Sequence, residues 1–155
     1  MAVMAQQEAD LAGICTQRKL PLLLLRPTLI YGCGRDRNVS LLARLARRFG
    51  VIPLAGKAAG RRQPVHADDL AELAVLALGA DSPLTMTSAA CGGGTLSYRE
   101  MAEKIASAVP RRVRLLTLPA DLMAAAVRLL APFPRWRGLS AEMVRRQSRD
   151  LVFDD

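Results

Sequence analysis

The chain has 155 residues, of which 51% are hydrophobic and 23% charged, so it is long and apolar enough to fold around a core, and disorder is excluded. Its formal net charge of +8 suggests nucleic acid as a binding partner. The arginines are scattered, however, and the 4% of aromatic residues are too few for base stacking, so we expect that the protein is not a nucleic-acid binder. Three separated cysteines without a CxxC pair favour a reducing compartment, and with no secretory signal we expect a cytoplasmic protein.

The first half of the chain alternates between helical and extended patterns. A helical pattern over residues 6–18 is followed by PLLLLRP (21–27), which predicts a strand buried on both faces. The glycines of YGCGRDRN (31–38) indicate a loop. An amphipathic helix over 40–49 then ends at Gly50. The remaining elements predicted in this half are a short strand over 51–54, an extended segment over 63–67 and a helix over 70–78.

The second half continues the alternation. Ser97 and Glu100 have the spacing of a capping box, which predicts that a helix begins at SYREMAEKIASAV. The other predicted elements are strands over 84–90 and 112–119 and helices over 121–130 and 141–149, the last capped by Ser140. Alternating helices and strands indicate an α/β chain.

The only histidine lies in the stretch RRQPVHADDL, residues 61–70. We expect no metal site there, because consecutive residues of an extended segment point to opposite faces and no second histidine completes a ligand set. We predict instead that Asp69 is the N-cap of the next helix, with Glu72 three residues later. Asp68 adds a favourable charge near the positive end of the helix dipole, and His66 is a structural residue.

Two motifs in a fixed order carry a resemblance to a known family. Residues 26–38 (RPTLIYGCGRDRN) and 61–74 (RRQPVHADDLAELA) resemble the C-terminal half of an extended short-chain dehydrogenase/reductase of the NAD-dependent epimerase/dehydratase family, which includes nucleotide-sugar epimerases. The resemblance implies an α/β fold with part of a Rossmann-like parallel sheet and the small C-terminal substrate-binding region. Residues 1–155 would form a single C-terminal portion without the N-terminal cofactor-binding half.

The resemblance also implies site residues. The backbone around Pro27, Thr28 and Leu29 would lie beside the nicotinamide carboxamide of NAD or NADP. The substrate, a nucleotide sugar or a related small molecule, would be bound by residues in three places: Asn38 near its diphosphate, Val51 and Ile52 along its base, and Arg62 on its phosphates. Arginine suits the last role because its planar guanidinium makes bidentate phosphate contacts.

Other parts that the family requires are absent from this sequence. The run Gly92–Gly94 lacks the spacing of a pyrophosphate-binding turn and is expected to be a plain turn. The family's catalytic tyrosine is followed four residues later by a lysine, but here Tyr31 is followed by Arg35 and Tyr98 by Ala102. We therefore assign no catalytic residue and expect the chain to be inactive alone.

These observations lead to two hypotheses about function. The first is a fragment or truncated form of a sugar-nucleotide epimerase/dehydratase-like oxidoreductase, and the alternative is a non-catalytic nucleotide-binding or assembly module of the same fold.

An incomplete sheet would leave the leucine strand with an open edge, so we expect marginal stability or association with another chain that completes the sheet. The arginines and Trp136 of the apolar segment 120–138 suggest a membrane surface, but a buried helix followed by a turn is the better interpretation.

Overall fold

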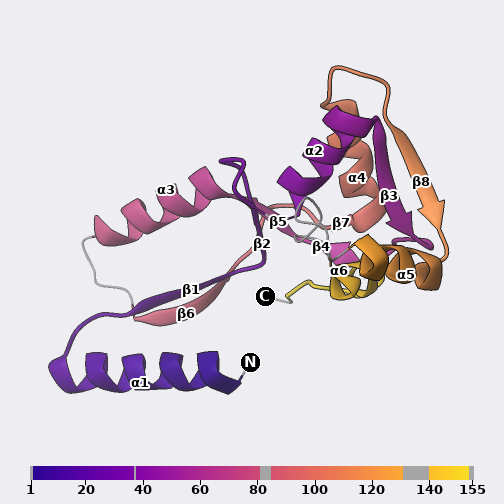
Figure 1. Ribbon diagram of the computed structural model, residues 1–155. Coiled ribbons are helices and arrows are strands. Elements are labelled where there is room, and N and C mark those ends of the chain that lie inside the picture. Colours follow the sequence, from indigo (N-terminus) through magenta and orange to yellow (C-terminus); the bar gives the residue numbers. More distant parts are fainter. Residues whose placement is uncertain (1, 37, 81–84, 131–139, 154–155) are drawn as a thin grey trace.

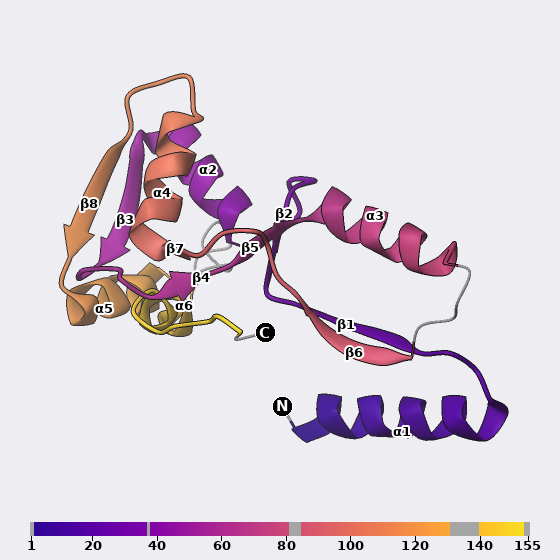
Figure 2. The same cartoon turned by 180° about the vertical axis from the view of Figure 1, so that it is seen from behind.

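The computed structural model of the protein describes residues 2–36, 38–80, 85–130 and 140–153. Helices and strands alternate along the chain, which confirms the predicted α/β class. They form two parts, which Figures 1 and 2 show from opposite sides: an elongated arm and a rounder body, joined by short strands.

The arm is built on two parallel strands, β1 (Leu23–Pro27) and β6 (Met86–Ala90), which pair in register with Leu25 opposite Ser88. Helix α3 (Ala67–Leu78) lies on one side of this pair and helix α1 (Ala2–Arg18) on the other (Figure 1). Helices on both sides of parallel strands are the arrangement of an α/β sheet.

The body is built on a second parallel pair, β3 (Val51–Ala55) with β8 (Arg114–Leu118). Four helices pack around this pair: α2 (Val39–Phe49), α4 (Tyr98–Ser107), α5 (Ala120–Leu130) and α6 (Ala141–Arg146). Two short pairs join the arm to the body, parallel β2 (Leu29–Tyr31) with β5 (Pro64–His66) and antiparallel β4 (Arg61–Arg62) with β7 (Leu96–Ser97).

The hydrophobic core lies in the body. Its larger cluster joins α2, β3 and α4, and its buried members are Leu42, Ala46, Ile52, Leu54, Ala58, Tyr98, Met101, Ala102, Ile105 and Val109. A smaller cluster joins β3 to α5 and α6 through Ala55, Met123, Val127 and Val144. The body therefore supplies the rigid frame on which a site can be built.

Local signals in the sequence set several helix ends as predicted. The Ser97 side chain accepts a hydrogen bond from the Glu100 amide, and the Glu100 carboxylate accepts one from the Ser97 amide at 2.7 Å, which confirms the capping box. The Ser140 side chain caps α6 by accepting a hydrogen bond from the Met143 amide at 3.3 Å. Gly50 ends α2 with φ 69°, a left-handed conformation in which glycine has no steric cost.

Two predictions were wrong in detail. Helix α3 begins at Ala67, and its N-cap is His66, whose Nδ1 accepts from the Asp68 amide at 3.2 Å, so Asp69 lies in the first turn and is not the cap. The leucine strand is half-buried, not buried on both faces, because β1 has one neighbouring strand among the described residues.

No helix in the described segments is long and apolar enough to cross a bilayer. Much of the apolar segment considered for a membrane surface (131–139) lies outside them.

Ile52 and Leu76 offer a matched test of where the core lies, since Ile52 is fully buried in β3 and Leu76 of α3 is 65% exposed. Ile52→Ala should lower the free energy of unfolding by about 2–5 kcal/mol, because it leaves a cavity in the body. Leu76→Ala should change it by less than about 0.5 kcal/mol. Urea denaturation of both variants measures this difference, and equal losses would contradict the location of the main core clusters in the body.

Candidate functional site

A cavity of about 420 Å³ lies where the arm meets the body. Its walls come from the end of β1, strand β2, the residue before α2, strand β4, the start of α4, helix α6 and the segment after α6. The residues that line it are Pro27, Thr28, Leu29, Ile30, Asn38, Arg62, Tyr98, Met143, Arg146, Leu151 and Phe153. This volume lies in the range of small-molecule sites.

Five of the predicted site residues meet at this cavity although they come from three separate segments: Pro27, Thr28, Leu29, Asn38 and Arg62. Val51 and Ile52 are not among its lining residues. Ile52 is fully buried in the body core, and Val51 pairs with Arg114 in the β3–β8 ladder. The cavity thus brings together the residues expected near the nicotinamide and the diphosphate. The two residues expected near the base lie away from it.

Thr28 holds the crossing from β1 to β2 in place. Its amide donates to the carbonyl of Ala90 at 3.4 Å, and its hydroxyl donates to the carbonyl of Gln63. The backbone around Pro27 and Leu29 is thereby tied to both β6 and the segment before β5, so this cavity wall is fixed by contacts distant in sequence.

Asn38 is available to the cavity because another residue caps α2. Asp36 accepts hydrogen bonds from the amides of Asn38 at 3.0 Å and Ser40 at 2.9 Å and from the Ser40 hydroxyl, whereas the Asn38 side chain makes no capping bond. Partial burial raises the pKa of Asp36, but the hydrogen bonds from Ser40 and Asn38 outweigh it and lower the pKa overall. The carboxylate is therefore held ionised at the positive end of the helix.

Arg62 is buried, with 2% of its surface exposed, and its guanidinium is bonded to backbone. One terminal nitrogen donates to the carbonyls of Arg61 at 2.7 Å and Arg149 at 2.6 Å, and the other donates to the carbonyl of Arg146. The guanidinium carbon lies 5.8 Å from the centre of the Tyr98 ring. Burial lowers the pKa of Arg62, yet arginine remains protonated in proteins, so the wall carries a positive charge.

The segment after α6 forms the remaining wall by pairing with β4 and its neighbours. The Arg61 amide donates to a carboxylate oxygen of Asp150 at 2.7 Å, and the Leu151 amide donates to the Arg61 carbonyl at 2.9 Å. The Phe153 amide donates to the side-chain oxygen of Gln63 at 3.0 Å. These bonds place Leu151 and Phe153 against the cavity as its apolar side.

The charged side chains that line the cavity in the described part of the chain are all positive. Arg62 and Arg146 line it, and no described lining residue is acidic. The Arg146 side chain is 60% exposed, and its Nε lies 3.4 Å from a carboxylate oxygen of Glu142, a pairing that contributes little at an exposed position. Two guanidinium groups and the Asn38 amide favour an anionic ligand, since arginine and amide donors bind phosphate and carboxylate oxygens.

The two tyrosines have different surroundings, and Tyr98 is the one that lines the cavity. Burial raises the pKa of Tyr98 to about 12, although the nearby Arg62 lowers it, so the phenol in the cavity wall is neutral at neutral pH. Tyr31 is not a lining residue. Its ring packs edge-on against His66, with centroids 5.0 Å apart.

In the described part of the chain, the glycine run Gly92–Gly94 does not form a site for a dinucleotide pyrophosphate. Gly92 lies so close to the carbonyl of Pro64 that a Cβ there would overlap it, so Gly92 marks a close approach of two backbone segments. The strand β7 separates this run from α4, whereas a pyrophosphate-binding turn leads directly into a helix N-terminus. Nor does any cluster of three potential metal ligands occur in the described part of the chain.

Sequence reasoning missed several residues that shape the cavity. Asp36 stands four residues before Ser40 and could have been recognised as the start of a helix cap. Tyr98 and Arg146 line the cavity from α4 and α6, and no local pattern points to them. Gln147 is also buried, and its side-chain oxygen accepts from the Ala55 amide at 2.7 Å, which anchors the end of α6 to β3.

Comparison with known proteins gives a consistent set of relatives, although no family model matches the chain. Over 115 residues the chain is 23% identical to UDP-glucose 4-epimerase from Vibrio cholerae. The aligned region covers 74% of this chain and 35% of that protein. The chain thus spans about a third of the length of this curated relative.

Two solved structures show the same fold. UDP-glucose 4-epimerase from Thermotoga maritima, determined with UDP-glucose, has a TM-score of 0.63 at 16% identity over 74% of this chain and 38% of that one. dTDP-glucose 4,6-dehydratase from Bacillus anthracis, determined with NAD, has a TM-score of 0.56 at 16% identity over 72% and 37%. The chain therefore has the fold of part of an extended short-chain dehydrogenase/reductase, which confirms the expected resemblance.

Replacing Arg62 with lysine tests its part in holding the C-terminal segment. A lysine ammonium cannot span three carbonyls in one plane, so Arg62→Lys should lower the free energy of unfolding by about 3 kcal/mol. It should also expose residues 147–153 to limited proteolysis. Arg61→Lys is the matched control, because Arg61 contributes its backbone and not its side chain to these bonds. Equal stability of the two variants would contradict this role.

The raised pKa of Tyr98 predicts a loss of stability at alkaline pH. The fold favours the neutral phenol, so its contribution is complete below pH 10, where the unfolded chain titrates, and is lost as the pH rises towards 12. Between about pH 9 and about pH 12 the wild-type protein should lose about 2 kcal/mol more than Tyr98→Phe. Urea denaturation at both pH values measures this. Parallel losses would show that Tyr98 titrates normally.

Proposed function

We propose that this chain forms the substrate-binding part of a sugar-nucleotide epimerase- or dehydratase-like oxidoreductase that uses NAD or NADP. The observation that carries the proposal is the meeting of Pro27, Thr28, Leu29, Asn38 and Arg62 at one cavity, where no acidic residue is found among the described lining. The relatives support it, because they include two UDP-glucose 4-epimerases, one of them determined with UDP-glucose, and a dTDP-glucose 4,6-dehydratase determined with NAD.

In this proposal the anionic diphosphate of a nucleotide sugar occupies the positive side of the cavity. Arg62 contributes its charge while its hydrogen-bond donors hold the carbonyls at the end of α6, and the exposed guanidinium of Arg146 makes the direct contact. The Asn38 amide adds a neutral donor, and Leu151 and Phe153 cover the apolar side. Charge and hydrogen bonding then act on the same oxygens.

Turnover requires groups that this sequence does not contain. The cofactor supplies hydride transfer when it is bound, and the family's tyrosine and lysine move the proton, but neither that pair nor the pyrophosphate-binding turn is present in residues 1–155. The chain's own residues bind and orient the substrate. On this proposal the 155-residue chain binds nucleotide sugars without converting them.

A non-catalytic nucleotide-binding or assembly module is the second candidate, favoured by the absence of the tyrosine–lysine pair. The two candidates differ in what the cavity is for. A biological function that survives loss of Arg146 would favour the assembly module, whereas a substrate-binding part loses its function together with its affinity.

Titration with UDP-glucose tests the proposed site. The wild-type chain should bind UDP-glucose saturably in isothermal titration calorimetry, and Arg146→Gln should weaken binding about tenfold, or about 1.4 kcal/mol. Arg145→Gln is the matched control, since Arg145 is the exposed neighbour on α6 that does not line the cavity. Absence of binding by the folded wild-type chain, or equal effects of both variants, would reject the proposed site.

A further inference from the structure

The Tyr98 side chain is almost entirely buried in the wall of the cavity of about 420 Å³, with 8% of its surface exposed. Its hydroxyl makes no hydrogen bond to a described residue, although every sealed polar atom of the described side chains has a hydrogen-bond partner. The hydroxyl is therefore not sealed and opens onto a cavity. Because buried polar groups are nearly always hydrogen-bonded in proteins, a hydroxyl left open in this way can bind a ligand.

The fold holds Tyr98 in a fixed position. Tyr98 is the first residue of α4, and the capping box of Ser97 and Glu100 sets the start of that helix. Its amide donates to the Gly60 carbonyl at 2.9 Å, and the Arg62 guanidinium carbon lies 5.8 Å from the centre of its ring. The ring also belongs to the larger core cluster of the body. A donor that is held rigidly before binding loses little conformational entropy when the ligand arrives.

The protonation state of Tyr98 suits an anionic ligand. Burial raises the pKa of Tyr98 to about 12, although Arg62 lowers it, so at neutral pH the phenol keeps its proton and can donate a hydrogen bond. Hydrogen bonds to ionised acceptors are roughly twice as strong as those between neutral groups. No described lining residue is acidic, so no carboxylate of this wall competes with a phosphate oxygen for the phenol.

Tyr98 also borders a smaller cavity of about 30 Å³ among α2, α5 and α6. No charged side chain is found in the described lining of this smaller cavity. Its volume has room for water but not for a phosphate group. An anion therefore approaches Tyr98 from the larger cavity.

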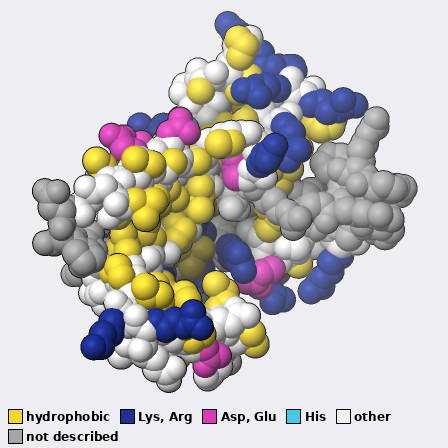
Figure 3. Space-filling model, turned by 90° about the vertical axis from the view of Figure 1, so that its left-hand side faces the viewer, with side chains coloured by type: hydrophobic (Ala, Val, Ile, Leu, Met, Phe, Trp, Pro, Cys, Tyr) yellow, Lys and Arg dark blue, Asp and Glu magenta, His cyan; other side chains and the backbone are white. Residues whose placement is uncertain are grey.

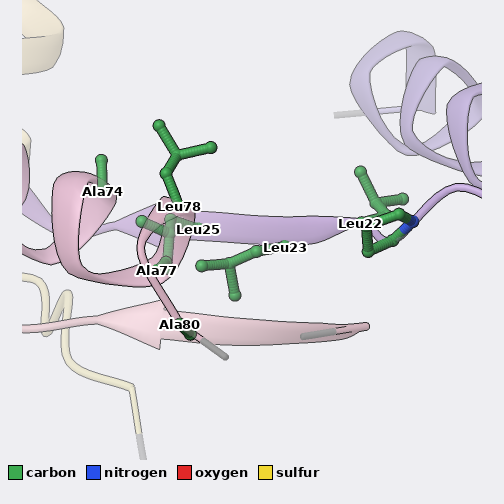
Figure 4. A pocket seen from close by; sticks show the side chains of 8 residues that line it. Leu22, Leu23, Leu25, Ala74, Ala77, Leu78 and Ala80 are labelled. Atoms are coloured by element: carbon green, nitrogen blue, oxygen red, sulfur yellow. The ribbon is translucent and has the colours of Figure 1, made fainter. Parts of the chain in front are cut away.

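A groove on the arm offers no side-chain donor to a phosphate. Figure 3, which views the molecule from the side of the arm, shows hydrophobic side chains gathered in a broad band across this face. The groove has a volume of about 480 Å³ and lies along β1 beneath α3 (Figure 4), and its described lining consists of leucines, alanines and a proline. Anion binding is therefore assigned to the cavity that Tyr98 shares with Asn38 and Arg62.

We propose that the Tyr98 hydroxyl donates a hydrogen bond to a phosphate oxygen of the ligand, which makes Tyr98 a ligand-binding residue of the cavity. This role rests on the proposed function, in which the diphosphate of a nucleotide sugar lies on the positive side of the cavity. Three elements then each supply a donor: Asn38 before α2, Tyr98 at the start of α4 and Arg146 on α6. Arg62 directs its donors to backbone carbonyls, and Tyr98 beside it adds a donor that meets the ligand.

Calorimetric titration of Tyr98→Phe with UDP-glucose and with pyrophosphate tests this role. The substitution removes the hydroxyl and keeps the ring, so it should weaken the binding of both ligands about tenfold, the loss expected for one hydrogen bond to a charged acceptor. The melting temperature at neutral pH should not change, because the hydroxyl has no partner among the described residues. Tyr31→Phe is the matched control, since Tyr31 packs against His66 and does not line the cavity. It should bind both ligands as the wild type does.

The outcomes separate the role of Tyr98 from the proposed function. Wild-type affinity of Tyr98→Phe for both ligands would overturn the role, and the proposed function would stand if Arg146→Gln still weakens the binding of UDP-glucose. Pyrophosphate binding that depends on Tyr98, without binding of UDP-glucose, would keep the role and reject a nucleotide sugar as the ligand. Binding of neither ligand would overturn both. A lower melting temperature of Tyr98→Phe would show that the hydroxyl is bonded within the protein and would overturn the role.

NMR of the wild-type chain labelled with carbon-13 at the tyrosine Cζ gives a readout that does not depend on affinity. The chain has two tyrosines, and Tyr31→Phe assigns their two signals. Saturating pyrophosphate should shift the Tyr98 signal, because the phenol gains a hydrogen bond to an anion, and should leave the Tyr31 signal in place. A Tyr98 signal that does not move at saturation would overturn the role.

Discussion

The guanidinium of Arg62 is the interaction on which the candidate site depends. It binds the carbonyls of Arg61, Arg146 and Arg149 and packs against Tyr98, so one side chain joins β4, the end of α6 and the start of α4. Its hydrogen bonds go to backbone carbonyls, and the nearby Asp150 carboxylate also favours its charged form. A buried cation stabilised in this way holds the wall together and leaves the cavity electropositive, so structure and ligand preference have the same cause.

Local features of the fold could be predicted from the sequence, and long-range ones could not. The capping box at Ser97, the turn at Gly50 and the apolar β1 depend on residues a few positions apart. His66 displaced Asp69 as the cap of α3 because an imidazole nitrogen can accept an amide hydrogen bond as a carboxylate does. Which of the two residues becomes the N-cap depends on the local backbone geometry, and the residue types alone do not determine that geometry.

The candidate site shows the same division. Some of the segments that line the cavity could be anticipated through a family resemblance, but two of the three carbonyl partners of Arg62 lie 84 and 87 residues further along the chain. No spacing rule connects them. Ile52 was expected near a ligand and is instead fully buried in the body, because the apolar alternation that suits a binding strand equally suits a core strand. The resemblance anticipated segments that meet at the cavity, and the packing decides which of their residues line it.

The run Gly92–Gly94 illustrates how unequal identical residues can be. Gly92 lies where the loop after β6 passes against the backbone of Pro64, while Gly93 and Gly94 have open space around them. A side chain at the first position would push apart the two segments that connect the arm to the body, and side chains at the other two would meet only solvent. In any collection of variants or relatives, the first glycine should therefore be nearly invariant and its two neighbours free to vary.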